Sequence, residues 1–208
     1  MNNLFNGCQT LTEINTAHFD TSAVITMDGM FADCKGMESF DLTNFDTSKV
    51  WNFKNLFNGC SGLLHADLSS FVTTGATHMN NMFANVTALT RLDLSSFNTK
   101  GATYLTGMFN DMVALRWLKL SRDFSFKGTT GTAGNWALLP TPSTDNTYLG
   151  MWAQEDDQAQ AFTPAQMQER TDSAIAHTWI WARKQMANGN VGGQAYAIYD
   201  AGRLIFFG

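Results

Sequence analysis

Apolar residues recur along roughly the first 120 residues of the chain with a period of 26. Each period is anchored by a phenylalanine that follows a methionine or leucine. The five anchors are Phe5, Phe31, Phe57, Phe83 and Phe109. A fixed period of this length is typical of stacked repeats, because a single unit cannot bury its own apolar face. The pattern therefore predicts a repeat array.

Each repeat opens with an L-x-x-L-x-L-like segment in which apolar and polar positions alternate toward the end. The clearest copies are Leu63–Leu68, Leu89–Leu94 and Leu115–Leu120, and looser ones begin at Leu11 and Met37. Alternation with a period of two indicates a short strand. We expect five such strands, one per repeat, to stack as a parallel sheet with a spacing of about 4.8 Å.

A second segment of each repeat has apolar residues at helical spacing. In one copy Asp46 and Thr47, which suit a helix N-cap, precede Val50, Phe53 and Leu56. Two positions after each anchor phenylalanine stands a residue that tolerates left-handed backbone and suits a helix C-cap. These residues are Gly7, Asp33, Gly59, Asn85 and Asp111. The pattern predicts a short helix in every repeat.

Together these signals predict an α/β solenoid. We expect a right-handed, leucine-rich-repeat-like coil with a parallel sheet on one face and short helices on the other, followed by a small, mainly β tail module. We expect four segments: a repeat array over 1–126, a loop and linker over 127–147, a small module over 148–184, and a linker with a β-hairpin over 185–208.

The repeat resembles that of the BspA-like leucine-rich-repeat proteins of bacterial surfaces. The resemblance is carried by L-x-x-L-D-L-S-x-F at Leu89–Phe97, F-D-T-S-x-V at Phe45–Val50 and M-x-x-M-F-x-x-C at Met27–Cys34. It implies a surface-exposed array implicated in adhesion to host or matrix proteins, with no catalytic residues in the pattern. The tail also resembles a module that follows the array in lactobacillus-type members. Within it, Thr163 and Pro164 predict a helix start.

Composition narrows the classes of function. Charged residues make up 15% of the chain and the net charge is −5, which argues against a nucleic-acid surface. The sequence contains no run of 18 apolar residues, so it predicts no membrane span. Residues 1–20 do not have the pattern of a signal peptide. The first residue falls inside the repeat register. This indicates either a piece of a longer array or an array degraded at its start. The resemblance to BspA-like proteins implies an extracellular protein of the bacterial cell surface, with export and anchoring signals outside this chain. An uncapped first repeat would favour self-association.

The cysteines predict a buried column of thiols rather than a metal site. Cys8, Cys34 and Cys60 share one register position with Val86 and Met112. No histidine shares that register and no C-x-x-C pair occurs, so we expect neither zinc nor another cofactor. The histidines are scattered, and Glu155–Asp157 reads as a solvated turn. We therefore expect no enzymatic activity.

The candidate ligand-binding residues are those that project outward between the core leucines of the predicted strands. They are Asp41, His65, Asp67, Arg91, Asp93, Trp117 and Lys119. For the aspartates, one hypothesis is a ledge for a cationic or hydroxyl-rich partner, and the other is a structural role in hydrogen bonds to neighbouring hydroxyls and backbone. Trp117 beside Arg91 is typical of an interface hot spot, unless the 122–140 loop covers it.

Two functions remain open from the sequence. The first is a surface binding module of the adhesin type that recognises a protein or a glycan through the outward strand face. The alternative is a structural spacer that holds another domain away from the cell wall. A uniform face of serine, threonine and aspartate would favour the spacer, whereas an uncovered patch of aromatic and charged residues would favour the binder.

Overall fold

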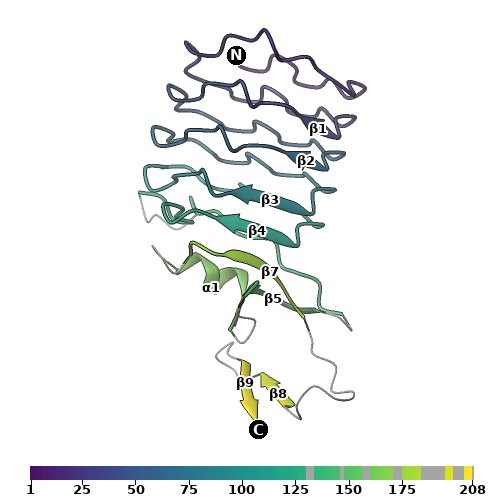
Figure 1. Cartoon of the computed structure of the whole chain (residues 1–208), viewed down its shortest axis with the longest axis vertical. Helices are drawn as coiled ribbons and strands as arrows, with labels where there is room; N and C mark the ends of the chain where they lie inside the picture. Colours follow the sequence, from purple (N-terminus) through teal and green to yellow (C-terminus); the bar gives the residue numbers. More distant parts are fainter. Residues whose placement is uncertain are drawn as a thin grey trace.

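The computed structural model describes residues 1–129, 134–145, 148–156, 160–170, 175–183, 195–198 and 204–207. The repeats lie on one another as layers along the long axis of the molecule, with the N-terminus in the outermost layer (Figure 1). The elements are β1 (Ser39–Phe40), β2 (His65–Ala66), β3 (Arg91–Leu94), β4 (Trp117–Leu120), β5 (Tyr148–Gln154), β6 (Ala161–Phe162), α1 (Pro164–Gln168), β7 (Thr178–Arg183), β8 (Ala195–Ile198) and β9 (Leu204–Phe207).

In the part of the chain that the structure describes, the strands form three sheets. β1 and β2 make a parallel pair, and β8 and β9 make an antiparallel pair. The largest sheet has the order β3-β4-β7-β5-β6. In it, β3 and β4 are parallel, whereas β7 runs antiparallel to both β4 and β5. The tail therefore continues the sheet of the last repeats.

The prediction of an α/β solenoid with short helices is wrong. Within the described ranges, the only helix is α1, which has five residues and lies outside the repeats. The segments expected to be helices are runs of turns, and Leu11–Thr16 of the first repeat is not a strand. The expected five-stranded parallel sheet is also replaced by two short parallel pairs.

The destination of the backbone hydrogen bonds explains the missing helices. The N–H groups of Asn55, Phe57 and Gly59 donate to carbonyls 25 residues further along, at 2.8–3.0 Å. The alternate N–H groups, such as that of Leu56, donate three residues back and close turns. An α-helix would need every N–H to donate four residues back. Half of these donors instead join one layer to the next.

Left-handed backbone enforces this turn pattern. Asn55 and Gly59 have φ of +55° and +77°, and the same two register positions are left-handed in the other repeats from Asn3 to Asp111. The prediction of left-handed residues two positions after each anchor phenylalanine is confirmed, but they do not cap helices. Since a right-handed helix cannot contain such residues every few positions, the apolar spacing of three and four arises from successive turns.

The strands are short because aspartate side chains compete for backbone donors. Asp67 Oδ1 accepts a hydrogen bond from the N–H of Ser69 at 3.0 Å, two residues further on. Asp41 and Asp93 do the same with Thr43 and Ser95. This local bond withdraws the N–H from any ladder, so each strand ends within two to four residues.

Stacked phenylalanines fill the core. The rings of the anchor residues form a continuous column, with centroids 5.7–6.4 Å apart and planes within 13° of parallel. A second column includes Phe71 and Phe97, 6.3 Å apart. Such offset stacks add to the free energy gained by burying apolar area. In the first repeat Phe5 and Phe19 remain partly exposed, since no described layer covers them.

Buried threonines satisfy backbone groups between the layers. Thr47 Oγ1 accepts from the N–H of Val72 at 2.8 Å and donates to the carbonyl of Val72 at 3.1 Å. Thr73 makes the same pair of bonds with Asn98. Both threonines are at most 1% exposed. A buried hydroxyl that both donates and accepts carries no unsatisfied polar group into the core.

The tail closes the last repeat. Leu118 of β4 faces Trp179 of β7, and Trp152 of β5 faces Trp181 of β7. Trp152 and Trp179 are fully buried, and their indole N–H groups donate to the carbonyls of Pro140 and Ile175. The predicted helix start is confirmed, because Thr163 is the N-cap of α1 and completes a capping box. How the hairpin side chains pack lies outside the described residues.

Replacing Gly59 by Ala should destabilise the protein by about 1–3 kcal/mol. Its left-handed backbone disfavours a side chain, and an added Cβ would overlap the carboxylate of Asp33. Gly75→Ala is the matched control, because Gly75 has no positive φ and its Cβ would meet open space. Urea unfolding followed by circular dichroism measures both. Equal midpoints for the two variants would contradict this account of the turns.

Native thiol labelling should modify Cys8 well before Cys34 and Cys60. Cys34 and Cys60 are fully buried, and their thiols donate to the carbonyls of Phe5 and Phe31. Burial raises their pKa to about 11 and about 12, so the reactive thiolate is scarce at neutral pH. Cys8 is only partly buried, contrary to the expectation of a fully buried column. Labelling at pH 8, read by peptide mass mapping, checks the order; equal rates for all three would refute it.

Candidate functional site

The outward side chains of the last two repeats gather around Trp117. The guanidinium of Arg91 on β3 lies 4.1 Å from the centroid of the Trp117 ring on β4. The indole N–H of Trp117 donates to Glu155 Oε2 at 3.3 Å. These three residues form what we term the Trp117 cluster. Parallel pairing of β3 with β4 sets Arg91 directly opposite Trp117, which explains the stacking.

An ion pair lies one step along the same strands. Lys119 Nζ is 3.3 Å from Asp93 Oδ2, and both side chains are nearly half exposed. An exposed pair of this kind is screened by solvent and contributes little to stability. Lys119 and Asp93 therefore present a solvated, paired surface beside the Trp117 cluster.

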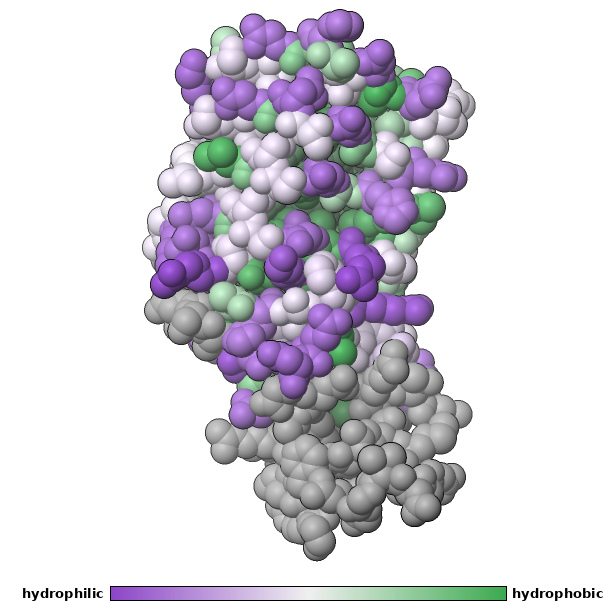
Figure 2. Space-filling view, viewed as in Figure 1, coloured by the Kyte–Doolittle hydropathy of each residue, from purple (hydrophilic) through white to green (hydrophobic). Residues whose placement is uncertain are grey.

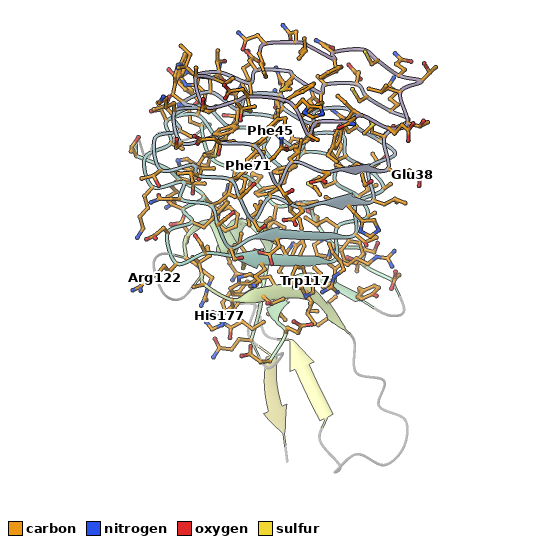
Figure 3. All side chains as sticks on the ribbon, turned by 45° about the horizontal axis from the view of Figure 1, so that its top comes forward. Glu38, Phe45, Phe71, Trp117, Arg122 and His177 are labelled. Carbon is orange, nitrogen blue, oxygen red and sulfur yellow. The ribbon has the colours of Figure 1, made fainter. Side chains whose placement is uncertain are left out.

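A hollow opens where β5 and β7 continue the sheet. It has a volume of about 380 Å³ and is lined by Glu155, Asp156, His177 and Thr178. Figure 3 shows Trp117 and His177 beside the junction of the last repeat with β7. Glu155 belongs to both the hollow and the Trp117 cluster. Two carboxylates in the lining suit a cationic group, through charge attraction.

The remaining predicted residues lie apart from this hollow. His65 is exposed on β2, which pairs with β1 in a separate sheet. Asp41 and Asp67 each accept two bonds at Oδ1, from the hydroxyl and the N–H of the residue two positions on. These bonds are of the kind expected if the aspartates have a structural role in hydrogen bonds to neighbouring hydroxyls and backbone.

The hydrogen bonds also alter the acidity of these carboxyl groups. The hydroxyl and then the N–H of Thr43 lower the pKa of Asp41 below its ordinary value of 3.8. Ser69 lowers the pKa of Asp67 in the same way. Both carboxyl groups are therefore ionised at neutral pH.

Sequence reasoning missed the tail residues of the hollow. Glu155 and Asp156 read as a solvated turn, and His177 read as an isolated histidine. The antiparallel pairing of β4 with β7 brings them to the repeats. The sequence signal that could have linked these residues to the repeats is the strand pattern of Thr178–Arg183. Its two tryptophans are buried, so this strand has to pair with the exposed edge of a sheet.

The described residues lack two features that would define other kinds of site. No three or more metal-ligating side chains gather into a group in that part of the chain. Nor does any helix there have the length and apolar character needed to cross a membrane.

Comparison with known proteins identifies one family. The family model described as "Mycoplasma protein of unknown function, DUF285" matches residues 1–117. This range is more than half of the 208 residues and contains the repeats up to the start of β4. No curated protein and no solved structure matches the chain. The resemblance to BspA-like proteins stays a prediction.

The Ser69→Ala variant should raise the pKa of Asp67 toward 3.8, because it removes the hydroxyl donor that lowers it most. Ser70→Ala is the matched control, since Ser70 Oγ donates to the Leu42 carbonyl instead. In the wild type, the stabilisation from this lowered pKa is present above pH 3.8 and is lost as the pH falls through the folded-state pKa. Carboxyl ¹³C NMR measures the titration. An unchanged Asp67 curve in Ser69→Ala would show that the turn does not tune this group.

Proposed function

Because the chain belongs to the DUF285 family of Mycoplasma proteins, and because aromatic and charged groups gather beside an open hollow at the end of its repeats, we propose that it is a non-enzymatic binding module of a bacterial surface protein. In this proposal it engages a protein partner through the Trp117 cluster. A lysine or arginine of the partner enters the hollow between Glu155 and His177.

The observation that carries the proposal is the arrangement of the Trp117 cluster. Trp117 is partly exposed, and its ring and indole N–H are already oriented by Arg91 and Glu155. Tryptophan and arginine are the residue types that most often dominate binding energy at protein interfaces. Side chains held in place before binding lose less conformational entropy when a partner arrives.

The hollow suits reversible binding better than catalysis. It is open to solvent, so its carboxylates and imidazole are not held in the water-excluded environment that enzymes use to strengthen electrostatic interactions. Its acidic lining matches the net charge of −5 of the chain and favours a basic partner. We place the protein at the extracellular surface of the cell in this proposal.

The spacer function remains the second candidate, and the aspartate column favours it. Asp41 and Asp67 are engaged in turns, so much of the outward face has a structural role. Figure 2 shows polar side chains scattered over the repeats, with apolar residues in small patches between them. The spacer would apply if the Trp117 cluster had no partner.

An array of immobilised fibronectin, laminin and type I collagen tests the proposal. We expect the protein to bind at least one of them. Trp117→Ala and Glu155→Gln should each weaken that binding about tenfold or more, as truncation of interface anchors commonly does. Surface plasmon resonance measures the dissociation constants.

Val72→Thr is the control, because Val72 is 44% exposed on a different segment and threonine keeps its β-branched shape. It should bind as the wild type does. Wild-type affinity in both Trp117→Ala and Glu155→Gln would place the interface elsewhere. Failure of the wild type to bind any matrix protein would favour the spacer.

A further inference from the structure

A second exposed surface runs along the repeats on a segment that the strand face does not include. Thr26, Asn52, His78 and Tyr104 form successive parallel bridges, so this part of each repeat lies in register with the next. Aromatic rings are in contact along it. Trp51 packs edge-on to His78 with centroids 5.3 Å apart, and His78 lies 4.5 Å from Tyr104. We term Ile25, Trp51, His78 and Tyr104 the aromatic strip.

The core does not account for these side chains. Ile25, Trp51 and Tyr104 are 55%, 42% and 41% exposed. The residues that follow the bridge position in each repeat are buried and serve the core instead: Met27, Phe53, Met79 and Leu105. An apolar side chain left in solvent contributes little to folding, and a contiguous series of them marks an interaction surface.

Polar groups able to donate and accept hydrogen bonds accompany the strip. Two residues beyond the bridge position stand Asp28, Lys54, Asn80 and Thr106, which are partly or fully exposed. Their formal charges are one negative and one positive. The His78 ring uses Nδ1 for a 2.8 Å contact with Thr77 Oγ1, and in the described part of the chain Nε2 has no partner. The strip therefore combines apolar rings with a rim that is neutral overall.

The other side of the strip is open. Gly75 and Gly101 occupy the position where the second repeat has Lys49. A Cβ added at Gly75 would meet nothing within 4 Å. Because glycine has no side chain, Gly75 and Gly101 would not obstruct an extended ligand that lies across Trp51, His78 and Tyr104.

We propose that the aromatic strip is a binding site for a neutral, extended, β-linked oligosaccharide. The apolar C–H faces of sugar rings pack on aromatic side chains, and their hydroxyls bond to carboxylate, amide, ammonium and imidazole groups. The four layers of the strip span about 14 Å, from three steps of about 4.8 Å. In an extended β-linked chain the sugar rings repeat at a spacing close to that between layers, so successive rings meet successive repeats.

The charges separate this ligand from other extended chains. A nucleic acid or an anionic membrane would need a basic surface. The rim offers one lysine balanced by one aspartate, in a chain with a net charge of −5. The site is separate from the Trp117 cluster, so its test stands whether or not that cluster binds a protein.

Binding of chitotetraose and cellotetraose to the whole chain, measured by isothermal titration calorimetry and saturation-transfer NMR, tests the proposal. We expect saturable binding of at least one of them. Trp51→Thr should weaken it about tenfold or more. Tyr104→Thr should weaken it as well, because threonine stands at the bridge position of the first repeat, as Thr26, and keeps the backbone register.

Two controls keep the result specific. Val72→Thr alters another residue of similar exposure, 44%, on a different segment, and should leave affinity unchanged. Val113→Thr, at a residue that is 64% exposed and belongs to neither proposed site, should also leave it unchanged. Equal binding by Trp51→Thr and the wild type, or no saturable binding of either tetrasaccharide, would overturn the proposal. Binding that is lost equally in Trp51→Thr and Val72→Thr would also overturn it.

Discussion

The structure depends on where each backbone N–H of a repeat finds its acceptor. Every second N–H in the turn segments donates to the following layer rather than to its own. A repeat taken alone would leave these donors unpaired, so the layers stabilise one another. The stacked phenylalanines and the buried threonines follow from the same spacing, because the hydrogen bonds hold equivalent residues of adjacent repeats at a fixed separation. The left-handed residues keep the turns that make this pattern possible.

Much of the repeat could be predicted from the sequence. The anchor phenylalanines, the left-handed positions such as Gly59 and the outward position of Trp117 all follow from register and residue type. The turns that stand in place of the expected helices could not be predicted, because Phe53, Leu56 and Phe57 have the same spacing on successive turns as they would have on a helix. The deciding fact is that their neighbours' N–H groups bond to another layer, which no local pattern records.

Only the part of the site that the repeats contribute could be predicted from the sequence. Arg91 and Trp117 share a register position, and their contact follows from parallel stacking. Glu155 and His177 reach them through a non-local antiparallel pairing, and Thr178–Arg183 could have paired with other edges. The aromatic strip was harder to predict, because Trp51 stands one position before the register shared by His78 and Tyr104.

The bonds between layers run along the long axis of the molecule (Figure 1). A pull between the two ends would therefore load them in tension, one layer at a time, instead of shearing a whole sheet at once. Each repeat that detaches would replace a rise of about 4.8 Å with 26 residues of extended chain, which is about 90 Å. An array of this kind would lengthen in steps under load, and each step would dissipate work.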